Sequence, residues 1–244
     1  METALLTQRV KQVALDAGAD IVGIASIDRY EHAPADVHPR GIFLHTQSVI
    51  VVGCRMVRGA LKTIEEGQFW QAYNCSSYQY INEVLAPHLL RKVVLFLEDL
   101  GYTSVPLHNP FGPGKGRPVA PGRSRPDGKL SLRVAGVAAG LGEIGRSKLF
   151  LSKRFGPRNR MFAIYTDAVL DADPLVPPGT ICDNCGLCNR ACPADAVAGQ
   201  RECKIRIGPY EYSHAPLDVV RCSVVHRGYD RSEERRVGKE CRSR

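Results

Sequence analysis

The sequence predicts an α+β body followed by a small cysteine-rich module. Two observations support this division. Segments with helical spacing of apolar residues alternate with short β-branched runs through the first part of the chain. Four cysteines then fall between positions 182 and 192 at CxxCxxCxxxCP spacing. We therefore expect the body over residues 1–172 and the module over residues 173–230.

Three segments of the body are predicted to be helices. Residues 3–17 place leucine, valine and alanine at helical spacing, and Gly18 ends the pattern. Residues 77–100 carry the longest such pattern, which Pro87 is expected to kink or divide. Residues 131–139, rich in alanine and valine, predict a third helix.

Short apolar runs predict strands over residues 20–26, 48–54, 102–107, 148–151 and 161–165. Between them, the segment 108–128 is rich in proline, glycine and arginine. A loop of this length inside a domain is a lid, a binding loop or a disordered segment. The aromatic side chains of positions 70, 73, 78 and 80 are of a type that lines flat pockets, but we expect them in the core.

Composition indicates a globular chain without a membrane segment. Hydrophobic residues make up 44% of the sequence, and its apolar runs are too short to cross a bilayer. The N-terminus lacks the features of an export signal, so we expect a cytoplasmic protein with reduced thiols. The formal charge of +8 is weak support for a nucleic-acid partner, because a solvated surface is the better explanation of it.

The last fourteen residues, 231–244, differ from the rest of the chain. They are densely charged and have no usable periodicity. They also resemble a translated sequencing adapter. We expect the native sequence to depart from this one after Asp230, and we exclude Cys241 as a ligand.

The cysteine spacing is that of bacterial-type [4Fe–4S] proteins. Two intervening residues allow one turn of chain to present successive sulfurs to one cluster. Proline suits position 193 because it fixes φ and has no N–H that needs a partner. Disulfides suit small secreted domains, and structural zinc usually takes two separated cysteine pairs. The predicted metal ligands are the four cysteines of this run and one more distant cysteine: Cys182, Cys185, Cys188, Cys192 and Cys222.

The number of clusters follows from counting cysteines. Six lie between Cys182 and residue 230, which is too many for one cluster and too few for two. In a two-cluster protein the first three hold one cluster, and Cys192 joins a second with Cys222. In the alternative, the four cysteines of the run hold a single cluster. We favour two clusters in an intact parent that continues past this sequence.

A glycine motif precedes the cysteines. Gly140, Gly142 and Gly145 match GxGxxG, and Asp167 lies where a ribose-binding acid would follow. The dinucleotide motif needs a strand directly before the first glycine, whereas here a helix is predicted. We therefore interpret the glycines as sites of tight turning and close backbone approach. They remain candidate cofactor-binding positions.

The blocks 139–146, 154–160 and 165–173, followed by the cysteine run, resemble the superfamily of epoxyqueuosine reductases and corrinoid reductive dehalogenases. The resemblance implies a nitroreductase-like α+β domain that cradles cobalamin. It also implies a bacterial ferredoxin-like module, here truncated, that supplies electrons from two [4Fe–4S] clusters. Glu143, Arg146 and Ser147 are closer to the dehalogenase branch, although no twin-arginine signal is present.

The same resemblance implies an oxidoreductase that acts on a small molecule or a tRNA base. Asp127 would be the proton donor and Arg158 a cationic group facing the cofactor. Ferredoxin or flavodoxin would be the electron donor. The alternative is a non-catalytic electron carrier, which the long segment ahead of the cysteines disfavours, since small ferredoxins need no such domain.

Overall fold

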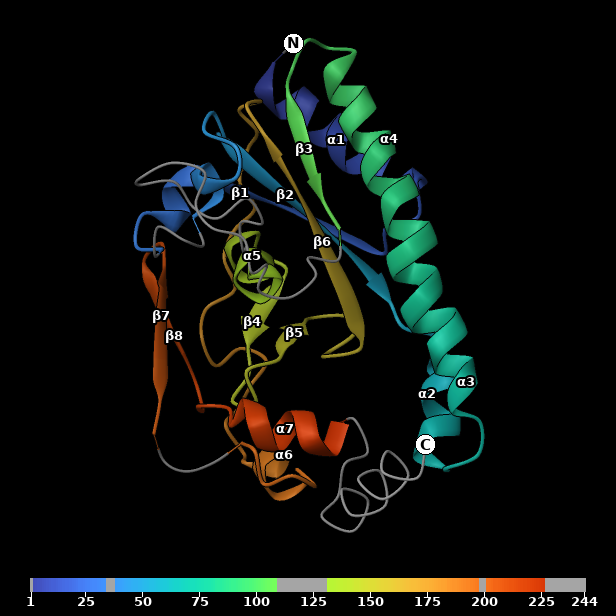
Figure 1. Cartoon of the computed structure of the whole chain (residues 1–244). Coiled ribbons are helices and arrows are strands. Elements are labelled where there is room, and N and C mark those ends of the chain that lie inside the picture. The colour runs from blue at the N-terminus through green and yellow to red at the C-terminus, as the bar shows by residue number, and fades with distance from the viewer. Residues whose placement is uncertain (1, 34–37, 109–130, 198–200, 227–244) are drawn as a thin grey trace, which may run out of the picture.

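The structure, a computed structural model, describes residues 2–33, 38–108, 131–197 and 201–226. Its centre is a four-stranded sheet in the order β1-β2-β6-β3, with every neighbouring pair antiparallel (Figure 1). The strands are β1 (Ile21–Ser26), β2 (Ser48–Arg55), β3 (Ser104–Leu107) and β6 (Asn159–Thr166). The β-branched run of β2 lies between β1 and β6 and is buried except at Arg55, as expected for a central strand.

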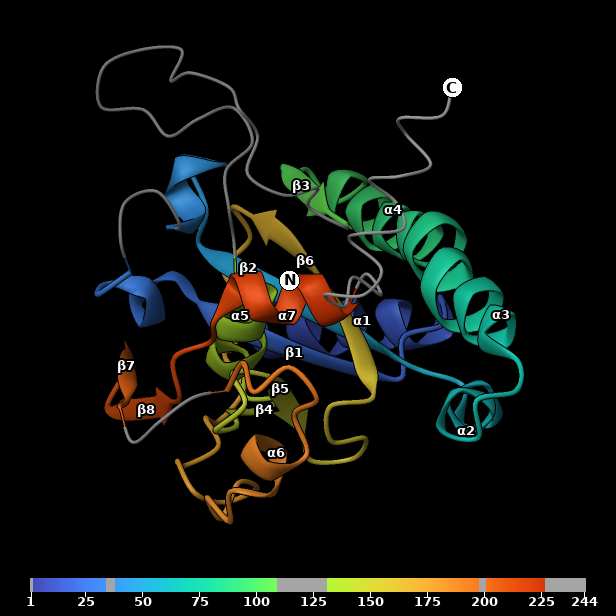
Figure 2. The same ribbon diagram turned by 60° about the horizontal axis from the view of Figure 1, so that its bottom comes forward.

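Helices cover one face of this sheet. The helices α1 (Thr3–Asp16) and α4 (Ala86–Glu98) bury Val10, Leu89 and Val93 against the sheet residues Ile50 and Ile164. Their apolar residues follow helical spacing, so burial of this stripe accounts for the position of both helices. Figures 1 and 2 show α4 running along the edge of the sheet beside β3.

The opposite face carries α5 (Leu132–Ala138) and a short hairpin of β4 (Gly142–Ile144) and β5 (Phe150–Ser152). Small residues of α5 pack against Val49, Val51 and Ala163 of the sheet. This layer leads directly to the cysteine run, because β4 lies between α5 and the segment that contains the cysteines (Figure 2).

The remaining elements are shorter. In chain order they are η1 (Ile27–Tyr30), η2 (Pro39–Gly41), α2 (Arg58–Glu65), α3 (Trp70–Tyr73), η3 (Asn74–Leu85), α6 (Leu187–Arg190), β7 (Cys203–Ile207), β8 (Tyr210–His214) and α7 (Val219–His226). The hairpin of β7 and β8 packs Ile207 and Tyr212 against the same core as α5.

The predicted helices and strands are confirmed, with two corrections. The pattern over residues 77–100 is divided, as Pro87 predicts, but its first part is the π-helix η3 rather than an α-helix. Proline has no N–H for the α-helical ladder, and the ladder changes just before it. The aromatic group is also not core, since Trp70 is 62% exposed and Tyr80 is 51% exposed.

Other predictions fall outside the structure. The predicted loop beyond residue 108, with Asp127, and the segment 231–244 with Cys241 lie outside the described residues. Among the helices that the structure does describe, none combines the length and apolar character needed to cross a bilayer.

Candidate functional site

Five cysteines line one cavity of about 570 Å³. They are the predicted ligands Cys182, Cys185, Cys188, Cys192 and Cys222. The first four come from the loop around α6, and the fifth comes from α7, which lies beside that loop (Figure 1). Leu149, Leu151 and Val197 supply apolar walls. We call this space the cysteine cavity.

Local backbone geometry forms the cysteine loop. Asn184 and Gly186 both adopt the left-handed conformation, with φ of 59° and 72°. Asparagine and glycine tolerate this conformation best, and here they turn the chain on either side of the second cysteine, Cys185. One turn of α6 then carries Cys188, and Cys192 follows directly after it.

Backbone N–H groups point at two of the sulfurs. The N–H of Arg146 donates to Cys182 Sγ at 3.4 Å, and that of Ala196 donates to Cys192 Sγ at 3.3 Å. The hydrogen bond from Ala196 is the main cause of the lowered pKa of the Cys192 thiol. Such bonds favour thiolate, which is the form that binds metal, and they also tune the reduction potential of a bound cluster.

The buried carboxylate of Glu143 fixes the start of the cysteine loop. This side chain, on β4, is 1% exposed. One oxygen accepts the N–H of Gly179 at 2.8 Å, and the other accepts those of Ile181, at 2.6 Å, and Cys182. A buried charge is tolerated where charge-assisted hydrogen bonds satisfy it. Glu143 therefore ties the body of the protein to the first predicted ligand.

The three motif glycines are explained by close packing. A Cβ on Gly142 would lie 1.9 Å from the carbonyl oxygen of Leu151, and one on Gly140 would lie 2.3 Å from that of Pro174. Gly145 lines the cysteine cavity. Because α5 precedes the motif and β4 follows the first glycine, the dinucleotide interpretation is excluded on geometry.

The five cysteines line a cavity and do not converge on a single position. Within the described part of the chain, no three Cys, His, Asp or Glu side chains are arranged to hold a single metal ion. Zinc in a structural site draws four ligands onto one ion at about 2.3 Å for sulfur. An iron–sulfur cluster instead takes its thiolates around the outside of a larger body. The run of four cysteines at CxxCxxCxxxCP spacing is the donor set expected for a cluster.

A second cavity, of about 490 Å³, adjoins the cysteine cavity. The two share Arg133, Leu149 and Pro157 as lining residues. Asn82 of η3 lines the second cavity and is 2% exposed, and its Nδ2 has no hydrogen-bond partner among the described residues. A buried amide without a partner is costly in a native protein, so Asn82 is a candidate contact for a polar ligand group in this cavity.

Arg160 fixes the wall of this second cavity. From β6 it donates to the backbone carbonyl of Ser77 at 2.8 Å and to the hydroxyl of Tyr73 at 2.9 Å. Its guanidinium also lies 4.7 Å from the centre of the Tyr78 ring. These contacts hold η3, and with it Asn82, against the sheet. π-Helical segments are rare and occur frequently at functional sites.

Of the two predicted catalytic residues, Asp127 lies outside the described residues, and Arg158 does not line the cysteine cavity. Arg158 lies on the connection between β5 and β6, about half exposed, with an ion pair to Glu65 at 3.1 Å. It lines a third cavity together with Arg55, Arg58 and Arg154. Sequence reasoning did not identify this arginine group, the anchoring role of Glu143 or the buried amide of Asn82. Each depends on how segments distant in the chain pack together.

No protein-family model matches the chain. A tetrachloroethene reductive dehalogenase of Dehalobacter restrictus is 34% identical over 142 residues, which cover 54% of this chain and 22% of the relative. Another, from Sulfurospirillum multivorans, is 27% identical over 227 residues and covers 79% of this chain and 40% of the relative. The chain therefore spans well under half the length of the curated relatives it matches.

Two kinds of solved structure share the fold. The catabolic reductive dehalogenase NpRdhA matches with a TM-score of 0.66 at 18% identity, over 91% of this chain and 29% of that one. Epoxyqueuosine reductase from Bacillus subtilis matches with a TM-score of 0.54 at 16% identity, over 79% and 52%. The predicted resemblance is confirmed: the sequence relatives are reductive dehalogenases, and the mixed α/β fold is shared with both enzyme groups.

Proposed function

We propose that this chain is the cluster-bearing part of a reductase that delivers electrons from a [4Fe–4S] centre to a corrinoid. One observation carries the proposal: five cysteines surround a cavity that directly adjoins a second cavity with a buried, unpartnered amide. The sequence identity to tetrachloroethene reductive dehalogenases supports it. We propose a small organohalide as the substrate class, while a tRNA base rests on fold likeness to epoxyqueuosine reductases alone.

The cluster ligands that we propose are Cys182, Cys185 and Cys188, with Cys192 or Cys222 completing the set. Bound thiolates would be stabilised by the N–H groups of Arg146 and Ala196. Glu143 holds the backbone of Cys182 in place by accepting its N–H. In an intact parent we propose two clusters, the second using Cys192 and Cys222.

The second cavity has the chemistry to hold a corrinoid. Its walls combine apolar side chains, such as Phe150 and Met161, with the donors Asn82 and Arg160. A corrin ring carries amide groups around an apolar macrocycle, so the free Nδ2 of Asn82 matches an amide carbonyl at its rim. When bound, the corrinoid would supply the reductive cleavage of a bond in the substrate, since the protein itself offers no such chemistry. Arg133, Leu149 and Pro157 would separate the two groups, because they line both cavities.

Two roles remain proposals from the resemblance. Asp127 as proton donor lies outside the described residues. Arg158, proposed as a cation facing the cofactor, lines the arginine cavity, which shares Met56 with the second cavity. Arginine side chains are cations with paired N–H donors, so Arg158 would orient an anionic group rather than transfer a proton.

We retain the division into a nitroreductase-like body, residues 1–172, and a ferredoxin-like module, residues 173–230, as part of the proposal. The junction is firmly attached. Asp173 accepts the N–H of Ile24 at 2.8 Å and pairs with Lys11 at 2.6 Å. The hydroxyl of Tyr212 donates to the carbonyl of Val176 at 2.7 Å. A module held in this way keeps its cluster at a fixed distance from the body. Ferredoxin or flavodoxin is the proposed donor.

The test is anaerobic reconstitution of the full chain with iron, sulfide and hydroxocobalamin, followed by gel filtration and absorption spectroscopy. We expect about four irons per bound cluster and a retained corrinoid spectrum in wild type. Asn82→Leu, which removes the unpartnered amide at similar volume, should retain iron but weaken corrinoid binding. Gln79→Leu is the matched control, because Gln79 is an exposed amide on the same helix η3 and does not line the second cavity.

The alternative function is a non-catalytic electron carrier. It predicts full cluster absorption with no corrinoid retained by either wild type or Asn82→Leu. Absence of iron and sulfide from carefully reconstituted wild-type protein would defeat both functions.

A further inference from the structure

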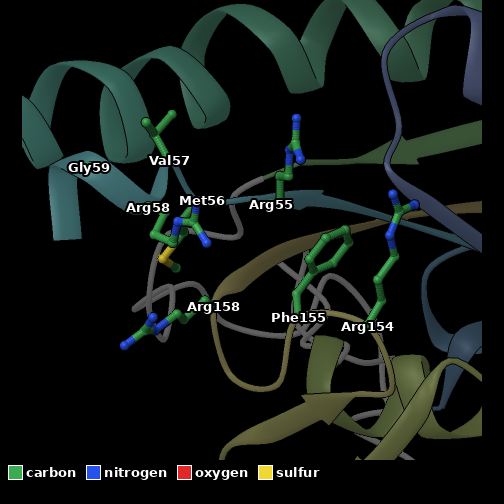
Figure 3. A pocket seen from close by; sticks show the side chains of 8 residues that line it. All are labelled: Arg55, Met56, Val57, Arg58, Gly59, Arg154, Phe155 and Arg158. Atoms are coloured by element: carbon green, nitrogen blue, oxygen red, sulfur yellow. The ribbon is translucent and has the colours of Figure 1, made fainter. Parts of the chain in front are cut away.

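Four arginines surround the largest of the cavities described above, of about 690 Å³. Arg55 and Arg58 come from the end of β2 and the start of α2, and Arg154 and Arg158 come from the connection between β5 and β6. In Figure 3 the segment 55–59 lies above the segment 154–158. Arg58 and Arg158 are at the left of the view, and Arg55 and Arg154 are at the right. We call this space the arginine cavity.

The sheet fixes the distance between the two segments. β2 pairs with β6 in an antiparallel register that places Arg55 opposite Asn159. One residue further, the N–H of Met56 donates to the carbonyl of Arg158 at 3.0 Å. Arg55 and Arg158 therefore stand at the end of a ladder of backbone hydrogen bonds, and this ladder fixes the spacing of the two segments that carry the four arginines.

The positive charge of this cavity is only partly balanced. Arg55 pairs with Asp20 at 3.3 Å, and Arg158 pairs with Glu65 at 3.1 Å. Among the ion pairs between described residues, Arg58 and Arg154 do not take part. Four guanidinium charges against these two carboxylates leave an excess of 4 − 2 = +2.

The start of α2 adds to this field. The helix begins at Arg58, and its first turn contains no acidic residue. The free N–H groups and the dipole of a helix N-terminus favour anions. A Cβ on Gly59 would meet nothing within 4 Å, so a ligand has open access to the backbone at this point.

We propose that the arginine cavity binds a phosphate-bearing ligand. Guanidinium groups present paired N–H donors that match phosphate oxygens, and they cannot lose their charge. Phe155, Met56 and Val57 form an apolar wall against which the organic part of such a ligand packs. Because the charges enclose a cavity instead of following a track across the surface, a compact phosphate fits better than a nucleic-acid backbone.

The ligand has two sources that share this chemistry. One is a phosphate ester of a small molecule that binds by itself. The other is the phosphodiester of a corrinoid tail, since Met56 lines both the arginine cavity and the second cavity. The first source goes beyond the proposed reductase function, and the second rests on it.

Calorimetric titration of the full chain with inorganic pyrophosphate tests the site. The variants are Arg58→Gln, Arg154→Gln and the double variant, and Arg91→Gln, an exposed arginine on α4, is the control. We expect each cavity variant to bind about tenfold more weakly or worse, and the control to bind like wild type. Arg58→Lys should recover part of the affinity, because it restores charge without the paired donors. Both side chains are exposed, so circular dichroism should show unchanged folding.

The proposal is overturned if wild type does not bind pyrophosphate at millimolar concentration, or if the double variant binds it as tightly. Parallel titrations with cyanocobalamin and with dicyanocobinamide, which lacks the tail phosphate, identify the source. Weaker binding of cyanocobalamin alone in the double variant assigns the corrinoid tail. Unchanged binding of both corrinoids, with pyrophosphate binding lost, assigns a separate phosphate ester. If neither corrinoid binds wild type, the reductase proposal fails while the pyrophosphate result still decides this one.

Discussion

Replacing Glu143 by glutamine should loosen the cysteine loop without changing the shape of the side chain. The carboxylate of Glu143 accepts three backbone N–H groups, from Gly179, Ile181 and Cys182. A carboxamide has one oxygen acceptor, which can serve Ile181 and Cys182. Its NH₂ then faces the N–H of Gly179, where two donors oppose each other.

The expected cost follows from these contacts. Losing the charge assistance on two hydrogen bonds and leaving one buried donor unsatisfied would cost roughly 2–4 kcal/mol. Glutamine avoids the burial of a charge, which returns part of this amount. We expect a net loss of about 2 kcal/mol, or about thirtyfold in the unfolding equilibrium, out of a typical total of 5–15 kcal/mol.

Urea unfolding of the metal-free chain and iron content after reconstitution measure the two consequences. Glu143→Gln should unfold at lower urea and hold its cluster less completely, with a changed electron paramagnetic resonance spectrum after reduction. Glu211→Gln is the control, because Glu211 makes an exposed ion pair with Lys204 on the hairpin of β7 and β8. If Glu143→Gln matched wild type in urea midpoint, iron content and spectrum, the carboxylate would have no role in positioning the loop.

Three further predictions follow from single residues. Cys185→Ala should lose iron on reconstitution and lower the melting temperature of the reconstituted protein, since bound metal contributes folding free energy; an unchanged iron content would remove it from the ligand set. Burial, with a smaller contribution from Asp20, raises the pKa of the Cys54 thiol to about 12. Iodoacetamide at pH 8 should therefore leave Cys54 unmodified in the folded metal-free chain and label it only in urea, as measured by mass spectrometry. Gly142→Ala should cost about 1–3 kcal/mol in urea unfolding, because its Cβ meets a backbone carbonyl, whereas Gly59→Ala, with open space and better helix propensity, should gain up to about 1 kcal/mol.

Sequence reasoning succeeded where the physical cause is local. The β-branched run at residues 48–54 predicts β2 because a central strand is buried on both faces. Gly18 follows α1 with a φ of 108°. The end of this helix is predicted by the glycine that follows the last apolar residue at helical spacing. Rejecting the dinucleotide motif was correct for the same reason, since the helix before Gly140 is visible in the local pattern.

The remaining features depend on contacts between distant segments. Glu143 looks like an ordinary member of a glycine-rich motif, and its function emerges only from partners 36 to 39 residues away. The arginine cavity requires the register of β2 against β6, which no periodicity encodes. The exposed Trp70 was misplaced because a large apolar side chain is usually buried, and only the packing of α3 shows otherwise.

The cysteine cavity bears on the number of clusters. If Cys192 belonged only to a distant second cluster, its side chain would be expected to point away from the first three cysteines. Instead it lines the same cavity as they do, and Cys222 joins them from α7. One cluster needs four thiolates, so these five residues contain one more than a single site uses. Alkylation of the reconstituted chain separates the cases: one cluster leaves Cys192 or Cys222 reactive, whereas protection of both indicates that each binds metal.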